Sequence, residues 1–238
     1  MNKFYYDLHV HSCLSPCADD DMTPQNIVGM CALKGLQIVA LTDHNSTKNC
    51  RVFCDTANEY GICGIPGVEL TTSEDIHMLC LFPSVEVAEE FEVVLESKRI
   101  MYKNKPEIFG HQYIVDENEV CTETIPYLLS YAVMLSVDEA IEEVHRLGGF
   151  ICPAHVDRTA NGMIGILGTV PSEYRFSCIE FKEKSKAEEI SAAHGLFETI
   201  HIFDSDAHYL GDISEPVHFL ELPFENPTPK EVISYLLK

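Results

Sequence analysis

The sequence predicts a single α/β domain in which about seven strand–helix units close into a barrel. Apolar runs of strand length alternate with helical patterns along the 238 residues, as is typical of parallel strands joined by right-handed crossovers. Metal-binding types of side chain follow several of these runs. In such a barrel the C-terminal ends of the strands meet at one end, which carries the active site. We therefore expect residues 1–238 to form one domain.

The first expected strand covers residues 4–11 and contains His9 and His11. Residues two apart on an extended strand point to the same face, so the two imidazoles can bind one ion. For this pair alone, the alternative is two buried histidines that are satisfied by hydrogen bonds.

Start and stop signals place the remaining elements. Thr23 and Pro24 are typical of the N-cap and first residue of a helix that ends before Gly35. The other expected helices cover about 47–60, 84–103, 136–147 and 187–194, and a last one begins at 228. The other expected strands cover 36–41, 62–68, 76–82, 150–155, 178–181 and 199–208, with an edge strand over 218–222.

Residues 104–135 interrupt this alternation. They are rich in turn-forming residues, with a short helix expected near 125–134. Loops on a rigid scaffold often carry specificity, so this insertion is a candidate substrate lid. A passive insertion is the alternative.

Composition limits the class of protein. With 46% hydrophobic and 23% charged residues, the chain is typical of a soluble globular protein. It has no apolar run long enough to span a membrane and no export signal, and its ten cysteines include no CxxC pair. We therefore expect a reducing, cytoplasmic location without membrane association. Cys13 and Cys17 lie near the expected metal ligands, but we expect them to be bystanders.

The net charge of −22 disfavours long nucleic acid as a partner, because such binding needs a basic surface. A small phosphorylated substrate is not excluded, since bound cations can reverse the sign of the field inside a site.

Candidate ligands gather at the expected strand ends. Histidine or acidic residues lie at or just after the ends of these strands, and one more lies in the first loop. They are His9, His11, Asp19, His44, Glu69, His155, Asp206 and His208. His77 lies nearer the start of its strand and fits less clearly. A ligand set of histidine and carboxylate suits Zn, Mn or Fe(II). Nine donors are too many for one ion and suit two or three ions about 3.5–4 Å apart, with Glu69 able to bridge. Structural polar residues are the alternative.

Several short motifs resemble those of the PHP (polymerase and histidinol phosphatase) family, and the resemblance spans residues 4 to about 210. They are His9-x-His11, Thr42-Asp43-His44-Asn45, Gly67-Val68-Glu69, His77, Pro153-Ala154-His155 and Asp206-Ala207-His208. The resemblance implies a distorted (β/α)7 barrel, TIM-barrel-like, with two or three divalent metal ions. It also implies a stand-alone member, since no polymerase region follows.

The resemblance assigns ligand roles to His9, His11, His44, Glu69, His77, His155, Asp206 and His208. Asp19 takes the remaining place, with Asp20 as the fallback. Members with three ions have a histidine there, so the aspartate leaves the third ion open. Asp7 and Asp43 are expected to orient the ligand histidines, although Asp7 could face the other side of its strand.

The expected reaction is hydrolysis of a phosphate ester by a metal-bound hydroxide. Arg158, three residues after His155, is expected to pair with phosphate oxygens; a surface salt bridge is its alternative role. Asp206 and His208 are expected to be catalytic as well as metal ligands. The substrate would be a phosphomonoester, a nucleotide bisphosphate or a short 5′-phosphorylated oligonucleotide. Histidinol phosphate is an alternative substrate, and a metal-binding regulatory module without turnover is an alternative function.

Overall fold

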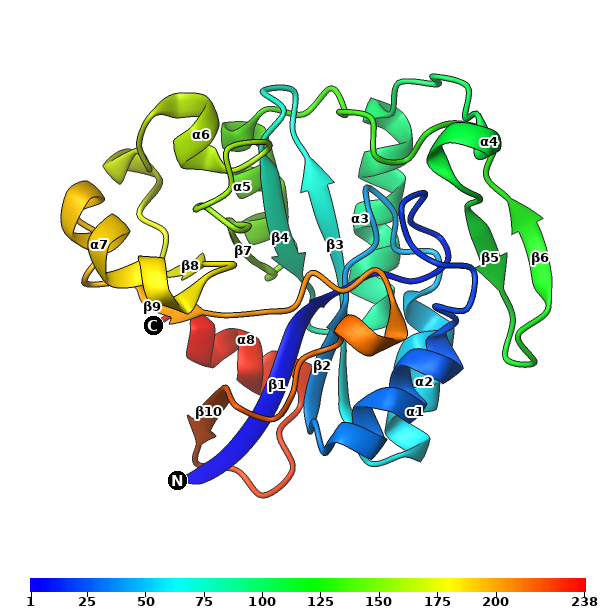
Figure 1. The fold of residues 1–238 in the computed structure, drawn as a ribbon, viewed down its shortest axis with the longest axis horizontal. Helices are drawn as coiled ribbons and strands as arrows, with labels where there is room; N and C mark the ends of the chain where they lie inside the picture. The colour runs from blue at the N-terminus through cyan, green and yellow to red at the C-terminus, as the bar shows by residue number, and fades with distance from the viewer.

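The protein, described over residues 1–238 by a computed structural model, is built on a curled mixed β-sheet (Figure 1). Six strands form this sheet in the order β10-β1-β2-β3-β4-β7. Its parallel part consists of β1 (Asn2–Val10), β2 (Ile38–Leu41) and β3 (Cys63–Thr71). The rest consists of β4 (His77–Leu81), β7 (Phe150–Pro153) and β10 (Phe219–Leu222).

Three pairs in the sheet are antiparallel, which corrects the expectation of an all-parallel sheet. Residues 72–76 join β3 to β4, and so short a connection can only form a hairpin. Strand β7 is antiparallel to β4, and β10 is antiparallel to β1.

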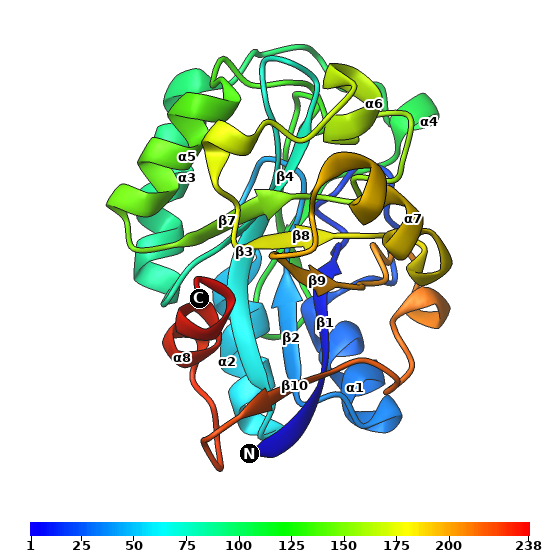
Figure 2. The same ribbon diagram turned by 90° about the vertical axis from the view of Figure 1, so that its left-hand side faces the viewer.

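The sheet does not continue into a closed ring of strands. Strands β8 (Cys178–Glu180) and β9 (Ile200–Ile202) form a separate parallel pair, which Figure 2 shows crossing the open side of the curl. Single contacts connect this pair to the rest, including a bond from Val156 N to Glu180 O at 3.0 Å. The fold is therefore a curled half-barrel completed by loops, and a full (β/α)7 barrel is not formed by these hydrogen bonds.

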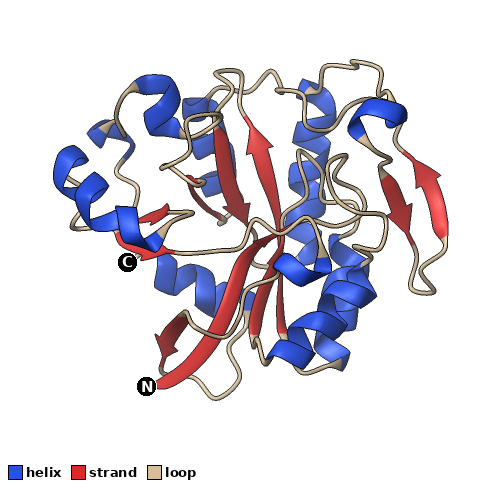
Figure 3. Cartoon of the chain, viewed as in Figure 1, coloured by secondary structure: helices blue, strands red, loops and turns tan.

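Helices surround the curled sheet (Figure 3). They are α1 (Pro24–Lys34), α2 (Cys50–Glu59), α3 (Val85–Lys98), α4 (Pro106–Phe109), α5 (Val137–Arg146), α6 (Met163–Leu167), α7 (Lys184–His194) and α8 (Pro229–Leu236). Capping confirms several predicted starts: Thr23 accepts from Asn26 N, and complete capping boxes begin α5 and α8. Helix α3 ends at Lys98 rather than near 103. None of the helices combines the length and apolar character that crossing a bilayer requires.

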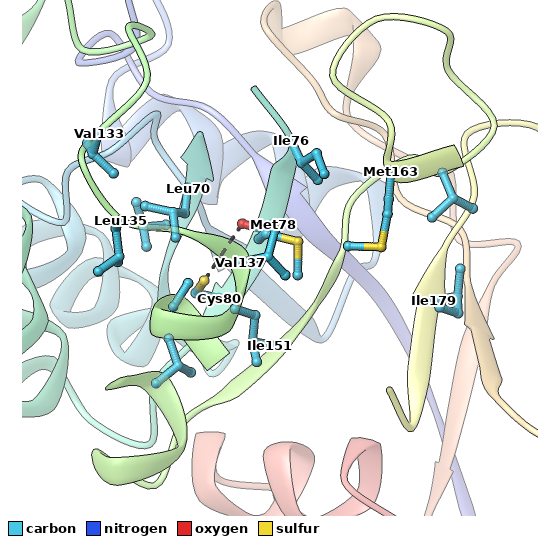
Figure 4. Close-up of a cluster of buried hydrophobic side chains, with 14 of the residues drawn as sticks. Leu70, Ile76, Met78, Cys80, Val133, Leu135, Val137, Ile151, Met163 and Ile179 are labelled. Atoms are coloured by element: carbon cyan, nitrogen blue, oxygen red, sulfur yellow. Dashed lines mark hydrogen bonds between the residues drawn. The ribbon is translucent and has the colours of Figure 1, made fainter. Parts of the chain in front are cut away.

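Side chains alternate between the inside and the outside of the curl, as period-two strands require. On β4, Leu79 belongs to the inner cluster, whereas Met78 and Cys80 belong to an outer one. Figure 4 shows Met78 and Cys80 packed near Ile151 of β7 and Val137 of α5. Helix α8 contributes apolar side chains to the inner cluster. The core is therefore layered, with apolar packing on both faces of the sheet.

Strand β1 breaks this alternation just before its end. Leu8 packs in the inner cluster, but Val10 packs outside with residues of α1 and α2. The pairing with β2 shifts register between Asp7 and Val10, which marks a β-bulge. The extra residue changes the phase of the strand. His9 and His11 therefore flank the outward-facing Val10 and point to the inner side.

The 104–135 insertion differs from its prediction. It holds α4 and an antiparallel hairpin of β5 (Tyr113–Val115) and β6 (Cys121–Thr124), and no helix forms over 125–134. Tyr113 N donates to Cys13 O at 2.9 Å, and Asn45 Nδ2 donates to Leu129 O at 2.7 Å. The insertion thus docks on the loops after β1 and β2, at the right of Figure 1. Its role as a lid stays a prediction.

Gly67 in β3 occupies a tightly packed position. An added Cβ would lie 2.7 Å from Cys80 O and 2.9 Å from the side chains of Leu81 and Thr42. We expect Gly67→Ala to lower the free energy of unfolding by about 1–3 kcal/mol through overpacking. Chemical denaturation of the metal-saturated protein measures this.

Gly29→Ala, inside α1, is the matched control, because its Cβ would meet nothing within 4 Å. It should raise the free energy of unfolding by about 0.5–1 kcal/mol. Equal free energies of unfolding for the two variants would contradict the claim that Gly67 is tightly packed in β3.

Candidate metal centre

The ligand candidates converge because their strands end at one edge of the sheet, called here the mouth. His9 lies at the end of β1 and His11 just beyond it, His44 follows β2, and Glu69 lies near the end of β3. A parallel bridge between His44 and Glu69 holds the last two together.

Strand direction explains the unusual place of His77. Because β4 runs opposite to β3, its first residue lies at the mouth, where Thr71 pairs with His77. Strand β7 runs opposite to β4 in turn, so His155 reaches the mouth just beyond its end. Asp206 and His208 come from the loop after β9.

The Glu69 carboxylate is the centre of this group and is only 1% exposed. Every one of its close ionic partners is an imidazole. Its Oε1 atom lies 2.7 Å from His77 Nδ1, 2.9 Å from His155 Nε2 and 3.3 Å from His9 Nε2. Its Oε2 atom lies 3.0 Å from His44 Nδ1 and 3.3 Å from His11 Nε2. Both oxygens are therefore surrounded by metal-binding nitrogens.

Asp206 is the second carboxylate of the site. Its Oδ1 atom lies 3.2 Å from His11 Nε2 and 3.5 Å from His9 Nε2. Its Oδ2 atom accepts from Arg158 Nη1 at 2.6 Å. His208 turns its Nδ1 toward the Asp206 backbone oxygen at 2.9 Å. The structure thus brings Arg158 to the edge of the same cluster.

The donors fit divalent ions. Three groups have ligand atoms within 4.8 Å of one another: His9/His11/Glu69/Asp206, His44/Glu69/His77 and His11/His44/His208. Several buried ligand atoms lack a hydrogen-bond partner, including His9 Nε2, His11 Nε2, His44 Nδ1 and Glu69 Oε2. Such orphaned atoms are costly unless a ligand satisfies them. Glu69 belongs to two of the groups, as a bridging ligand would.

The surroundings favour the ionised form of both carboxylates and the neutral form of His77. Against the effect of burial, nearby carboxylates raise the pKa of His9, His11 and His44. Burial raises the pKa of the Glu69 carboxyl, but the nearby imidazoles of His77 and His9 outweigh it and hold the pKa well below its usual range. Burial likewise opposes ionisation of Asp206, and the nearby His9 and His11 still lower its pKa. Burial lowers the pKa of His77, which favours the neutral imidazole that binds metals.

Glu180 at the end of β8 is a buried partner that the sequence analysis did not single out. Its Oε1 lies 2.8 Å from His9 Nδ1, and its Oε2 accepts from the backbone N–H of His155 at 2.7 Å. It therefore holds the ring of His9 with Nε2 turned to the cluster. Its place at the end of an expected strand was the available signal.

Polar contacts behind the ligands also differ from expectation. Ser15 Oγ lies 2.9 Å from His11 Nδ1 and donates to Asp43 Oδ1 at 2.7 Å, so Asp43 reaches a ligand through a serine. Asp7 accepts from the backbone N–H groups of Ser205 and Ser214 and contacts no candidate ligand. It faces away from the cluster.

The structure does not bring the predicted carboxylate of the first loop into any donor group. Asp19 accepts from Asp21 N at 2.9 Å, and its own backbone N–H donates to His208 O. Asp20 is exposed and lies 3.7 Å from His111 Nδ1. Burial opposes ionisation of the Cys17 thiol, but the nearby His44 and His208 lower its pKa to about 5.

Residues at the mouth have an unusual backbone. His155 has φ of 29°, Asp206 of 51° and Asn45 of 47°. The left-handed region costs a residue other than glycine about 1–3 kcal/mol and occurs often at functional sites. These turns aim His155 and Asp206 inward in the segments that follow β7 and β9.

Several solved structures share this fold. The lesion-specific endonuclease PfuEndoQ from Pyrococcus furiosus aligns over 99% of this chain and 56% of its own, with TM-score 0.67 and 18% identity. A protein from Bifidobacterium adolescentis described as a metal-dependent phosphoesterase aligns over 98% of this chain and 95% of its own, with TM-score 0.61 and 19% identity. An amidohydrolase from Chromobacterium violaceum gives TM-score 0.59 at 19% identity over 98% of this chain and 96% of its own.

At these identities the likeness shows the fold alone. The chain spans about half the length of the endonuclease that it matches. No curated protein matches the sequence. The sequence profile of the PHP domain matches residues 7–149, a segment that runs from β1 through α5 and carries the ligand candidates of the first four strands. Because this match covers more than half of the sequence, the chain belongs to the PHP family.

Proposed function

We propose that the protein hydrolyses phosphate esters with two or three divalent ions held at the mouth. The observation that carries the proposal is Glu69, a buried carboxylate surrounded by five imidazoles, in a cluster where several buried ligand atoms lack a hydrogen-bond partner. This donor set suits Zn, Mn or Fe(II). Membership of the PHP family and the fold shared with a metal-dependent phosphoesterase support a hydrolase.

The roles of the side chains follow from their places. His9, His11, His44, Glu69, His77, His155, Asp206 and His208 would hold the ions. When bound, divalent ions lower the pKa of coordinated water toward about 7 and polarise phosphoryl oxygens. Glu69 and Asp206 keep the imidazoles clustered and supply the negative charge that offsets the ions.

Arg158 would bind the substrate phosphate. Its side chain is 49% exposed, yet its guanidinium contacts Asp206 at the edge of the cluster. An exposed cation beside a metal site can reach a phosphoryl oxygen from solvent, and the guanidinium fork suits two oxygens.

The substrate would be a small phosphomonoester, a nucleotide bisphosphate or a short 5′-phosphorylated oligonucleotide. The net charge of −22 favours a small substrate over long nucleic acid. One structural neighbour, Endonuclease Q, was solved with a 27-mer duplex that carries an abasic lesion. The panel of test substrates therefore includes nucleic acid. Histidinol phosphate and a regulatory module without turnover remain the alternatives.

Activity should depend on the cluster. With Mn²⁺, Fe²⁺ or Zn²⁺, the protein should release phosphate from a panel of phosphomonoesters, nucleoside bisphosphates, 5′-phosphorylated oligonucleotides and histidinol phosphate. His9→Ala should lose bound metal and at least about a hundredfold in rate, since the ions supply several kcal/mol. His145→Ala, on the exposed side of α5, is the control. Metal-loaded protein without turnover of any ester would contradict the proposal and favour the regulatory module.

Glu180→Gln should weaken metal binding about 10–100-fold, the usual effect of losing a partner that orients a ligand. The amide has one acceptor oxygen and cannot serve both His9 and the backbone N–H of His155. Competition with a chelator measures the affinity. Glu183→Gln, three residues on and exposed, should leave it unchanged. Wild-type affinity in Glu180→Gln would show that Glu180 does not position His9.

Arg158→Ala should keep its bound metal and lose phosphate affinity. Charge-assisted hydrogen bonds contribute about 1.5–3 kcal/mol, so the inhibition constant for inorganic phosphate should rise about 10–100-fold. Metal content and phosphate inhibition are measured side by side. Arg146→Ala, another exposed arginine, is the control. Unchanged inhibition by phosphate in Arg158→Ala would show that Arg158 forms a salt bridge with Asp206 but does not bind phosphate.

A further inference from the structure

Two tyrosines at the edge of the insertion, called here the tyrosine pair, stack on each other in solvent. The ring centroids of Tyr102 and Tyr131 are 5.2 Å apart, and the angle between the ring planes is 12°. Tyr102 is 45% exposed and Tyr131 is 43% exposed. Aromatic residues that gather at the surface rather than in the core are typical of a binding surface.

Backbone contacts hold the tyrosine pair in place. Leu128 N donates to Tyr102 O at 2.7 Å, and Leu128 itself is buried. On the other side of the pair, Asn45 Nδ2 donates to Tyr131 O at 3.0 Å. Both rings are therefore attached to an ordered frame, so a ligand that stacks on them has little chain to order when it binds.

The same contacts bring the tyrosine pair to the side of the mouth. The hydrogen-bond donor to Tyr131 O belongs to the residue that immediately follows His44. Two residues after Tyr131, Val133 N donates to Thr71 O at 3.0 Å. Thr71 pairs in turn with His77 across the β3–β4 hairpin. The chain that carries Tyr131 thus runs along two turns that also carry ligand candidates.

The chain beside Tyr102 is basic in an otherwise acidic protein. Residues 98–105 contain four basic side chains and no acidic one, although acidic residues outnumber basic ones by 38 to 16 in the whole sequence. Lys98 and Arg99 have carboxylate partners. Lys103 and Lys105 are exposed and have none. Two lysines that are free to pair with an anion therefore lie next to an exposed aromatic ring.

A second aromatic pair on the insertion lacks this charge. His111 and Tyr113 stack with their centroids 5.0 Å apart. His111 Nδ1 lies 3.7 Å from a carboxylate oxygen of Asp20, which belongs to a run of three aspartates in the first loop. Carboxylates repel a phosphate, so this second pair does not suit an anionic ligand. It provides a comparison in which stacking geometry is present without basic neighbours.

We propose that the tyrosine pair stacks on a nucleobase of the substrate and that Lys103 and Lys105 pair with the neighbouring phosphate. This inference deepens the proposed function and rests on it for the phosphate that is held at the mouth. Stacking of a base on an aromatic ring accepts any base, and adjacent cations follow the phosphate backbone. The bases of a duplex already stack on each other, so the substrate would be a nucleoside bisphosphate or a short single strand rather than histidinol phosphate.

Binding without turnover tests this proposal. Short single-stranded oligonucleotides with a fluorescent label and a non-hydrolysable 5′ phosphonate are titrated with the metal-loaded protein, and anisotropy gives Kd. Tyr102→Leu and Tyr131→Leu should each raise Kd about 10–100-fold. Neither should change Kd for the same strand without bases. Tyr102→Phe and Tyr131→Phe keep the rings and should bind as wild type does, as should His111→Ala in the second pair.

The salt dependence of binding tests the lysines. Lys103→Ala and Lys105→Ala should each raise Kd and lower the slope of log Kd against log salt concentration by about 0.7 for a lost phosphate contact. Lys230→Ala is the control, because Lys230 is exposed on α8, which Figure 1 shows away from the insertion. Displacement of the labelled strand by a nucleoside bisphosphate would identify the smaller ligand, and failure of displacement would identify the strand.

Three results would overturn the proposal: wild-type Kd in both leucine variants, equal Kd for strands with and without bases, or an unchanged salt slope in both lysine variants. The first would leave the tyrosine pair as a surface for some other partner. Turnover separates this inference from the proposed function. Hydrolysis of a phosphomonoester without a base, combined with any of these results, would leave the proposed function standing. Base-dependent binding without hydrolysis of any ester would remove the proposed function instead.

Discussion

A buried anion governs the architecture of the mouth. Glu69 is almost inaccessible to water, and its close ionic partners are imidazoles rather than lysine or arginine. Burying a carboxylate costs several kcal/mol unless positive charge compensates it. Imidazole has an ordinary pKa near 6.5 and is a weak source of that charge at neutral pH. Divalent ions among the same nitrogens would provide it without protonating them, and metal binding would then stabilise this region.

The strands depart from regular geometry at the mouth, where Glu69 is buried among imidazoles. A bulge in β1 changes the phase of the strand so that His9 and His11 face inward beside the outward-facing Val10. The β3–β4 hairpin reverses β4 and brings His77, the first residue of its strand, to the same edge as Glu69. A regular parallel barrel would have carried His77 to the opposite end. The departures from regular geometry are therefore what assembles the ligands.

The order of elements and the residues that gather at the mouth could largely be predicted from the sequence, because caps, apolar runs and the positions of histidines are local signals. The β3–β4 hairpin, the bulge in β1 and the separate β8–β9 pair could not be predicted in this way, because register and strand direction depend on pairing between distant segments. Glu180 was missed for the same reason, because its partner His9 is remote in sequence. Asp19 was chosen by its distance along the chain, and the loop turns its carboxylate to Asp21.

The left-handed backbone at His155 and Asp206 has an evolutionary consequence. Each position holds a conformation that glycine adopts freely and other residues adopt at a cost. The chain therefore gives up stability at the two turns that complete the cluster of metal-binding side chains. A descendant released from selection for metal binding would gain stability by acquiring glycine at either turn. The persistence of histidine and aspartate there would mark the lineages in which the chemistry is still under selection.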